Sequence, residues 1–154
     1  MKFAVGASQA LQPYSEANMD NKLKLEIVTP EATVYSEDVD MVTLPAVQGQ
    51  IGILPQHIPL MTQMVPGEMI VRKNGSDRFL AVGEGLVEIT GDCVAILTDM
   101  AIAAEKIDEA KVEEARQRAQ ARLGEKLSYE EVASVNAAIA RSVAQLHVKR
   151  RHHN

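Results

Sequence analysis

The sequence contains few of the residues on which nucleic-acid-binding sites are built. Only 3% of its 154 residues are aromatic and none is tryptophan, so it lacks the stacking platforms typical of single-strand nucleic-acid binders. A net charge of −5 also disfavours a surface that follows a phosphate backbone. The single cysteine, Cys93, permits no internal disulfide, as is usual in a reducing compartment. We therefore expect no nucleic-acid partner.

Uninterrupted apolar segments are missing as well. Residues 41–67 contain no Asp, Glu, Lys or Arg, but Pro45, Pro55, Pro59 and Pro66 interrupt this segment. A regular membrane-spanning helix does not tolerate prolines at this density, so we expect no transmembrane segment. Residues 1–21 match a signal peptide poorly and are expected to form a disordered N-terminal extension.

The sequence shows no catalytic or metal-binding motif. His57 has no neighbouring Cys, Asp or Glu, and His152 and His153 are expected to belong to an exposed tail. There is no glycine–lysine phosphate loop and no G-x-S-x-G elbow. We expect no catalytic residue, no metal and no cofactor, and a chain that acts by contacting other proteins.

Residues 22–103 have the pattern of a β domain. Lys22–Ile27 alternates polar and apolar residues, which is typical of a half-buried strand. Asn74-Gly75-Ser76 and Thr90-Gly91-Asp92 each separate two apolar segments and predict tight hairpins. Closely spaced strands with turns between them indicate a β-sandwich or a barrel.

Residues 104–148 have the pattern of two helices. Ile107–Leu123 contains no Gly or Pro and is rich in helix formers, and Gly124 is suited to a C-terminal cap. Ser128 and Glu131 form a capping box, followed by apolar or small residues at spacings of three and four. These residues are Val132, Val135, Ile139, Ser142 and Leu146. The short connection predicts an antiparallel hairpin, and its alanine-rich faces bury little area, so we expect a weakly held element.

Charge is distributed unevenly along the chain. Residues 1–106 carry seven basic and fourteen acidic residues, whereas residues 107–154 carry nine and seven. Residues 149–154 form a basic tail that includes Lys149, Arg150 and Arg151. This tail fits either a solvated terminus or a segment that docks on an acidic partner surface.

Residues 49–60 combine glycines and prolines with large aliphatic side chains. Gly49 and Gly52 precede Pro55 and Pro59 within this short segment, and together they favour an irregular, rigid backbone. Two interpretations fit this composition. The segment is either a buried crossover between sheets or a rigid docking edge of low charge.

Five segments together resemble a known protein family. In order, they are Leu25–Glu31, Gly52–Leu60, Pro66–Gly67, Ile96–Asp99 and Ile107–Ala110. Their order and spacing, from about residue 22 to residue 148, resemble the epsilon subunit of bacterial F-type ATP synthases. The resemblance implies an all-β sandwich of about ten strands followed by a C-terminal antiparallel α-helical hairpin. It also implies a non-catalytic rotor subunit, peripheral to the cytoplasmic face of the bacterial inner membrane.

The resemblance further implies partners and their contact residues. The expected partners are the gamma subunit and the membrane c-ring, with the catalytic alpha and beta subunits added when the hairpin extends. Such a subunit couples proton-driven ring rotation to ATP synthesis and inhibits ATP hydrolysis through its helices. Gln50 and His57 take the positions that face the ring, while Lys149, Arg150 and Arg151 would meet an acidic loop of the beta subunit.

Some members of this family bind ATP on the folded hairpin through an Ile-Asp-x-x-Arg-Ala-x-x-Ala-x-x-Arg-Ala pattern. This chain keeps Ile107, Asp108 and Arg118, but it has Lys111 at the first arginine and Ile102 where ATP-binding members place a glutamate. A lysine can bind a phosphate, but without the bidentate fork of arginine. The alternative function is therefore an ATP sensor that binds nucleotide through Asp108, Lys111 and Arg118.

Overall fold

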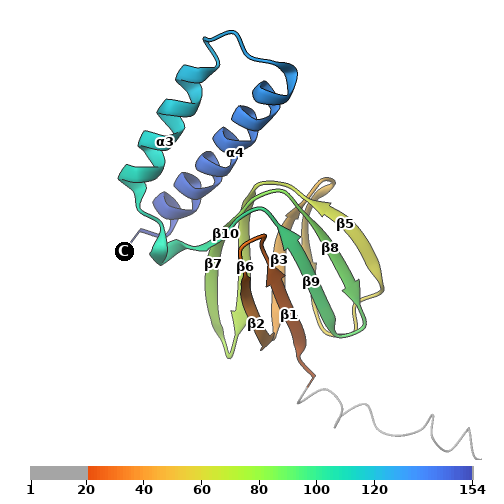
Figure 1. Cartoon of the computed structure of the whole chain (residues 1–154). Helices are drawn as coiled ribbons and strands as arrows, with labels where there is room; N and C mark the ends of the chain where they lie inside the picture. The colour runs from red at the N-terminus through yellow and green to blue at the C-terminus, as the bar shows by residue number, and fades with distance from the viewer. Residues whose placement is uncertain (1–20, 154) are drawn as a thin grey trace, which may run out of the picture.

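The computed structural model describes residues 21–153, in which ten strands are followed by a short 3-10 helix and two α-helices (Figure 1). The predicted fold class, a β-sandwich followed by a helical hairpin, is confirmed. Apart from its last residue, the predicted N-terminal extension lies outside the described residues.

The strands are β1 (Leu23–Val28), β2 (Thr33–Val39), β3 (Met41–Ala46), β4 (Gly49–Ile53), β5 (Leu60–Met64), β6 (Gly67–Lys73), β7 (Ser76–Val82), β8 (Gly85–Thr90), β9 (Cys93–Thr98) and β10 (Ala101–Ala103). The helices are η1 (Ala104–Lys106), α3 (Glu109–Arg122) and α4 (Tyr129–Arg151).

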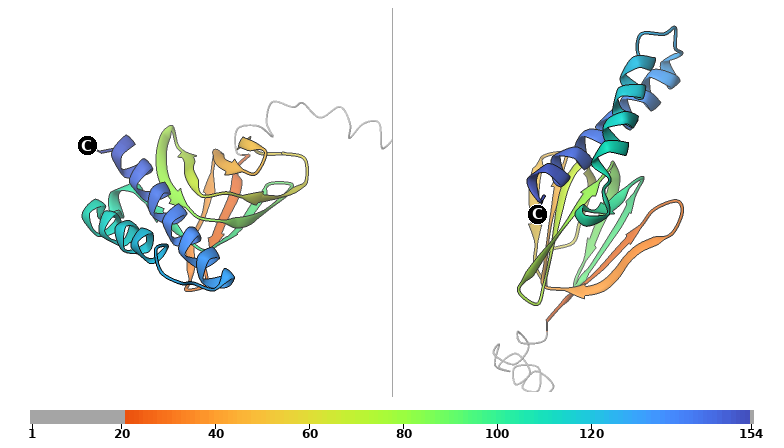
Figure 2. Two further views of the ribbon diagram at one scale, coloured as in Figure 1. Left: turned by 90° about the horizontal axis from the view of Figure 1, so that it is seen from above. Right: turned by 90° about the vertical axis from the view of Figure 1, so that its left-hand side faces the viewer.

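The strands form one hydrogen-bonded path, in the order β10-β7-β6-β3-β5-β8-β9-β1-β2, and β4 pairs with β3 beside this path. Strand β3 meets β5 at a single residue pair, Ala46 and Met64. At this junction the path turns, and the strands form two facing layers (Figure 2). The pairs are antiparallel with one exception in the described chain, because β1 and β9 run parallel.

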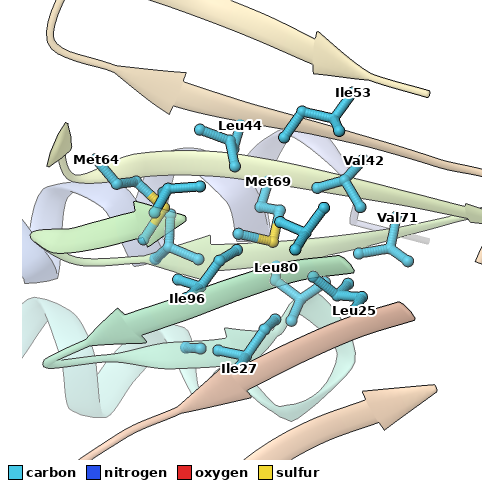
Figure 3. Close-up of a cluster of buried hydrophobic side chains, with 14 of the residues drawn as sticks. Leu25, Ile27, Val42, Leu44, Ile53, Met64, Met69, Val71, Leu80 and Ile96 are labelled. Carbon is cyan, nitrogen blue, oxygen red and sulfur yellow. The ribbon is translucent and has the colours of Figure 1, made fainter. Parts of the chain in front are cut away.

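The core lies between the two layers and consists of aliphatic side chains and methionine (Figure 3). On β1, the alternate residues Leu23, Leu25 and Ile27 are fully buried, as the period of two predicts. Leu44 and Ile96 pack from other strands into the same cluster. Burial of such a side chain contributes roughly 1.5–3 kcal/mol to folding, so the sandwich is stable without an aromatic core.

The predicted hairpin at Asn74-Gly75 joins β6 to β7. Both residues have positive φ values, 52° for Asn74 and 79° for Gly75. A two-residue hairpin turn with positive φ at both positions matches the right-handed twist of the strands, and Asn-Gly is its preferred sequence.

The two α-helices form an antiparallel hairpin, of which α4 is the helix that lies against the sandwich (Figure 1). Ser128 caps α4 as predicted, because its side chain accepts a hydrogen bond from the Glu131 N–H. Ser142 and Leu146 are buried, but Val132 of the predicted stripe is 36% exposed. The reason is geometric: the N-terminal end of α4 extends beyond the sandwich.

Helix α4 continues through residues 149–151, which the sequence analysis assigned to the basic tail. In this last turn, carboxylates of α3 and β6 lie within reach of the two arginines. The basic side chains are therefore part of the folded hairpin.

Candidate interaction surfaces

The described residues, 21–153, hold no group of three or more His, Cys, Asp or Glu side chains placed to bind a metal ion. Among the same residues, no helix has both the length and the apolar character needed to cross a bilayer. A hollow of about 1090 Å³ lies between the end of α4 and strands β2, β6 and β7, and most of its lining is polar.

The loop between β4 and β5 presents apolar side chains to solvent. Leu54 is 55% exposed and Ile58 is 75% exposed. Gln56 has a φ of 65°, and its backbone N–H donates to Oδ1 of Asp92 at 2.9 Å. Asp92 lies in the β8–β9 turn, so this contact ties two loops together at the end of the sandwich opposite the helical hairpin (Figure 1). Of the two interpretations of residues 49–60, the exposure favours a docking edge.

Gln50 and His57, the predicted ring contacts, lie at opposite ends of β4. Gln50 is exposed near the start of the strand, opposite Pro45 of β3. His57 follows the other end of the strand, where its Nδ1 lies 2.7 Å from the Ile58 carbonyl oxygen. The rest of the strand, about 10 Å of extended chain, separates them. Of the two residues, only His57 belongs to the exposed β4–β5 loop.

A second apolar surface crosses the outer face of the layer formed by β1, β9, β8 and β5. Its members are cross-strand neighbours: Val28 pairs with Leu97, Leu97 with Leu86, and Leu86 with Gln63. Val47 continues the line, because its backbone N–H donates to the Gln63 carbonyl at 3.1 Å. The exposed fractions are 57% for Leu97, 41% for Leu86 and 54% for Val47. We call these five residues the apolar row.

Four of the five residues are aliphatic, and an exposed surface of this kind is typical of one that another protein covers. This row was not predicted from the sequence, although β9 carries a signal for it. From Val94 to Leu97 the strand is apolar on both faces, and a strand of this kind is usually covered on both sides.

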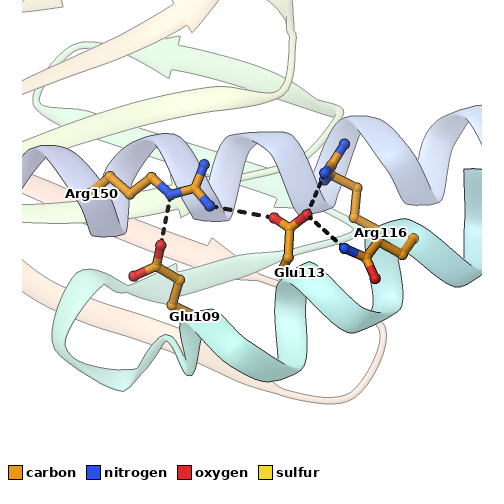
Figure 4. Close-up of polar contacts among 5 residues, drawn as sticks. Glu109, Glu113, Arg116 and Arg150 are labelled. Atoms are coloured by element: carbon orange, nitrogen blue, oxygen red, sulfur yellow. Dashed lines mark hydrogen bonds and ion pairs between the residues drawn. The ribbon is translucent and has the colours of Figure 1, made fainter.

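The basic residues at the end of α4 bind carboxylates of this same chain. Arg150 bridges the two helices: its Nε lies 2.7 Å from Glu109 Oε1, and its Nη2 lies 3.4 Å from Glu113 Oε2 (Figure 4). The hydrogen bond with Glu109 raises the pKa of Arg150. The pKa of Glu113 is held below its ordinary value, mainly by a hydrogen bond from Arg116. The end of α4 is thus joined to α3 by charge.

The neighbouring cations are engaged as well. Lys149 Nζ donates to the Ala104 carbonyl at 3.3 Å, and Arg151 Nη1 lies 3.2 Å from Glu68 Oε1. Lys149, Arg150 and Arg151, the predicted partner contacts, therefore all have partners inside the folded chain. Arg150 and Arg151 remain more than half exposed, but another protein that pairs with them has to compete with these internal partners.

The three candidate nucleotide contacts lie along α3. Asp108 is the N-cap of the helix, and its side chain accepts a hydrogen bond from the Lys111 N–H at 3.2 Å. Arg118 Nη1 lies 3.2 Å from Glu114 Oε1, and both of these side chains are mostly exposed. Arg118 lies ten positions after Asp108, which corresponds to about 15 Å along the helix axis. The fold does not gather the three side chains into one cluster.

Comparison with protein families matches both parts of the chain. Residues 22–104 match the beta-sandwich domain of the ATP synthase delta/epsilon chain. Residues 105–150 match the long alpha-helix domain of the same chain. The two matches together cover nearly all of the described residues.

Individual relatives agree with this match. The ATP synthase epsilon chain of Herpetosiphon aurantiacus is 41% identical over 132 residues, which cover 86% of this chain and 97% of the relative. A chain in the mitochondrial ATP synthase of Euglena gracilis, solved with OSCP, F1 and c-ring, superposes with a TM-score of 0.68 at 20% identity over 88% of this chain and 85% of that one. A chain in the central stalk and c-ring structure of the Tetrahymena thermophila mitochondrial ATP synthase gives a TM-score of 0.57 at 14% identity, covering 83% and 96%. At these identities the two structures share the fold of this chain.

Proposed function

This chain belongs to the ATP synthase delta/epsilon family, and from that premise we propose that it is a non-catalytic rotor subunit in the central stalk of a bacterial F-type ATP synthase. The observation that carries the proposal is the division of the molecule into a well-packed sandwich and a lightly attached hairpin. Helix α3 has no buried residue, and only the C-terminal part of α4 packs on the sandwich. One part is suited to anchoring, and the other is suited to movement.

The sandwich supplies the anchoring surfaces in this proposal. The apolar row binds the gamma subunit, because its exposed leucines require an apolar cover. The β4–β5 loop, with His57, contacts the polar loops of the membrane c-ring. Gln50, at the other end of β4, contacts the same ring. Together these contacts let the subunit couple proton-driven ring rotation to ATP synthesis on the catalytic subunits.

Capture of the gamma subunit tests the role of the apolar row. Leu97→Asp places a charge in the middle of the row and should abolish capture of gamma by the full-length chain. Val34→Asp is the matched control, because Val34 is also a strand residue, 43% exposed, but lies outside the row on β2. Equal capture of gamma by the two variants would remove the apolar row from the proposal.

The hairpin supplies the regulatory part of this proposal. When it separates from the sandwich, Lys149, Arg150 and Arg151 exchange their internal carboxylates for those of the catalytic alpha and beta subunits, and ATP hydrolysis is inhibited. Hydrolysis by the catalytic sector should therefore rise when residues 107–154 are deleted. Deletion of residues 148–154 alone should give much of the same rise. Unchanged hydrolysis in both deletions would exclude an inhibitory role.

The proposed location is the cytoplasmic face of the bacterial inner membrane, where the subunit is held peripherally through gamma and the c-ring. On this proposal the chain should migrate with the assembled complex and should leave the membrane when the catalytic sector and central stalk are stripped away. Retention on stripped membranes that lack gamma would contradict this placement.

The alternative function, an ATP sensor, has weaker support from the side-chain arrangement. Asp108 already accepts the cap hydrogen bond of α3, and Arg118 is paired with Glu114. On our proposal, titration of the full-length chain with ATP should show no saturation up to millimolar concentration. Saturation that is lost in Arg118→Ala would establish the ATP-sensing alternative.

A further inference from the structure

Glu68 is a buried carboxylate on the outer face of the sandwich. Within residues 21–153 it is the one charged residue that is buried, with 8% of its surface exposed. Its neighbour Met69 points into the sandwich core, and successive strand residues point to opposite faces. Glu68 therefore faces away from the core, toward the side where α4 lies (Figure 2). Its burial is a consequence of the docked hairpin.

Both carboxylate oxygens of Glu68 contact the C-terminal end of α4. Oε1 lies 3.2 Å from Arg151 Nη1, and Oε2 lies 2.8 Å from His152 Nε2. The His152 ring also stacks on Phe79 of β7, with ring centroids 3.5 Å apart and an interplanar angle of 11°. We call this set of four residues the Glu68 contact. It joins β6 and β7 to the last residues of the hairpin.

The other polar contacts between the hairpin and the sandwich are weaker. Arg141 Nη1 lies 3.0 Å from Asp99 Oδ2, but both side chains are about a third exposed, and ion pairs of this kind contribute little. Gln145 Nε2 lies 3.1 Å from the sulfur of Met100, which is a weak acceptor. A desolvated carboxylate is different, because removing its partners while it stays buried carries the full desolvation penalty.

Charges near the Glu68 contact cancel one another. Six charged side chains from β2, β6, β7, η1 and α4 line the adjoining hollow: Glu37, Lys73, Asp77, Arg78, Glu105 and Lys149. Three are acidic and three are basic, so they impose no net charge on the site. Among the charged groups here, the direct partners of Glu68 therefore contribute most to holding the end of α4, beside the packing of Val148.

We propose that the Glu68 contact controls release of the helical hairpin from the sandwich. While it is closed, Arg151 and His152 are occupied and α4 cannot turn away, since its last turn is fixed to β6 and β7. Opening it frees these side chains and uncovers Glu68. The consequence for ATP hydrolysis rests on the proposed function, but the control of release does not.

A distance measurement on the full-length chain tests the proposal. Fluorophores at Glu125, in the tip of the hairpin, and at Thr90, the last residue of β8, report separation of the hairpin when Cys93 is replaced by serine. Glu68→Gln keeps the size of the side chain but loses its charge, and should raise the released fraction about tenfold. Glu88→Gln is the matched control, because Glu88 is an exposed strand glutamate. This variant should leave the released fraction of the hairpin unchanged.

A double-mutant cycle separates a direct contact from a general loss of stability. His152→Ala should raise release in the parent chain but have little further effect in the Glu68→Gln background. The proposal is overturned if Glu68→Gln releases the hairpin no more than Glu88→Gln does, or if the effects of the Glu68 and His152 variants simply add.

A second readout distinguishes this proposal from the proposed function. An ATP synthase assembled with the Glu68→Gln chain should hydrolyse ATP more slowly than the parent, because more hairpin is free to inhibit. If release increases and hydrolysis does not fall, the Glu68 contact stands and the inhibitory role of the hairpin is wrong.

Discussion

Replacing Val148 with alanine should loosen the hairpin without unfolding the sandwich. Val148 is completely buried, with 0% of its surface exposed. It packs with Ala81, Met100, Ala104 and Ile107 in a cluster outside the main core. Losing two carbons costs about 1.6 kcal/mol of transfer free energy, and the residual cavity brings the loss to about 2 kcal/mol. Alanine returns about 0.5 kcal/mol through its higher helix propensity. The net loss of about 1.5 kcal/mol corresponds to roughly a tenfold change in the equilibrium between the docked, helical hairpin and its locally unfolded state.

Hydrogen exchange measured residue by residue provides the assay. Backbone amides in the C-terminal half of α4 should exchange about tenfold faster in Val148→Ala, because the hairpin opens as a unit of its own. Val143→Ala is the matched control: Val143 lies on the same helix but is 50% exposed, so its packing loss and its propensity gain nearly cancel. Amides of the buried strand residues Val94 and Ile96 should keep their protection in both variants.

Two outcomes would refute this reasoning. If the strand amides lose as much protection as those of α4, the hairpin and the sandwich unfold together, and the hairpin is not an independent unit. If Val143→Ala and Val148→Ala behave alike, packing of Val148 does not hold the hairpin in place.

Three further predictions concern the sandwich and the base of the hairpin. Gly85→Ala would place a Cβ 2.3 Å from the Leu97 carbonyl oxygen, so the thermal midpoint should fall by several degrees; an unchanged midpoint would show that the strands shift freely. The pKa of Asp40 is lowered chiefly by a hydrogen bond from Lys22, so the stability it contributes is present above its ordinary pKa and is lost as the pH falls through the lowered value. Lys22→Gln should raise the pKa of Asp40 in an NMR titration, and no movement would contradict that cause. Arg150→Ala removes both ion pairs to α3, and hydrogen exchange in α3 should rise by no more than a few-fold because these pairs are exposed; a large rise would give them a greater role.

The sequence predicted local features well because a few adjacent residues determine them. Asn74-Gly75 specifies its turn through backbone preferences of the two residues alone. Ser128 caps its helix through a hydrogen bond to the N–H three residues on. The alternating pattern of β1 likewise identified the buried face of that strand.

Long-range pairings were outside the reach of the same reasoning. Nothing in the pattern of β1 indicates that its second neighbour is the parallel strand β9. For the candidate site, the sequence left two interpretations of the segment with His57 open, a buried crossover and a rigid docking edge, and the loop is exposed. The contact of Glu68 with Arg151 and His152 could not be predicted, since these residues lie more than eighty positions apart. An isolated glutamate in a strand pattern reads as a solvent-facing residue.

The parallel pairing of β1 with β9 has a consequence for synthesis of the chain. Lys24 of β1 pairs with Cys93 of β9. Strand β1 can therefore pair with β9 only after about 70 further residues have left the ribosome. Domains generally fold as units during synthesis, and the helices follow β10 in the chain. The nascent sandwich therefore forms with Glu68 still in water, and the end of α4, made after it, packs on a surface that has already folded.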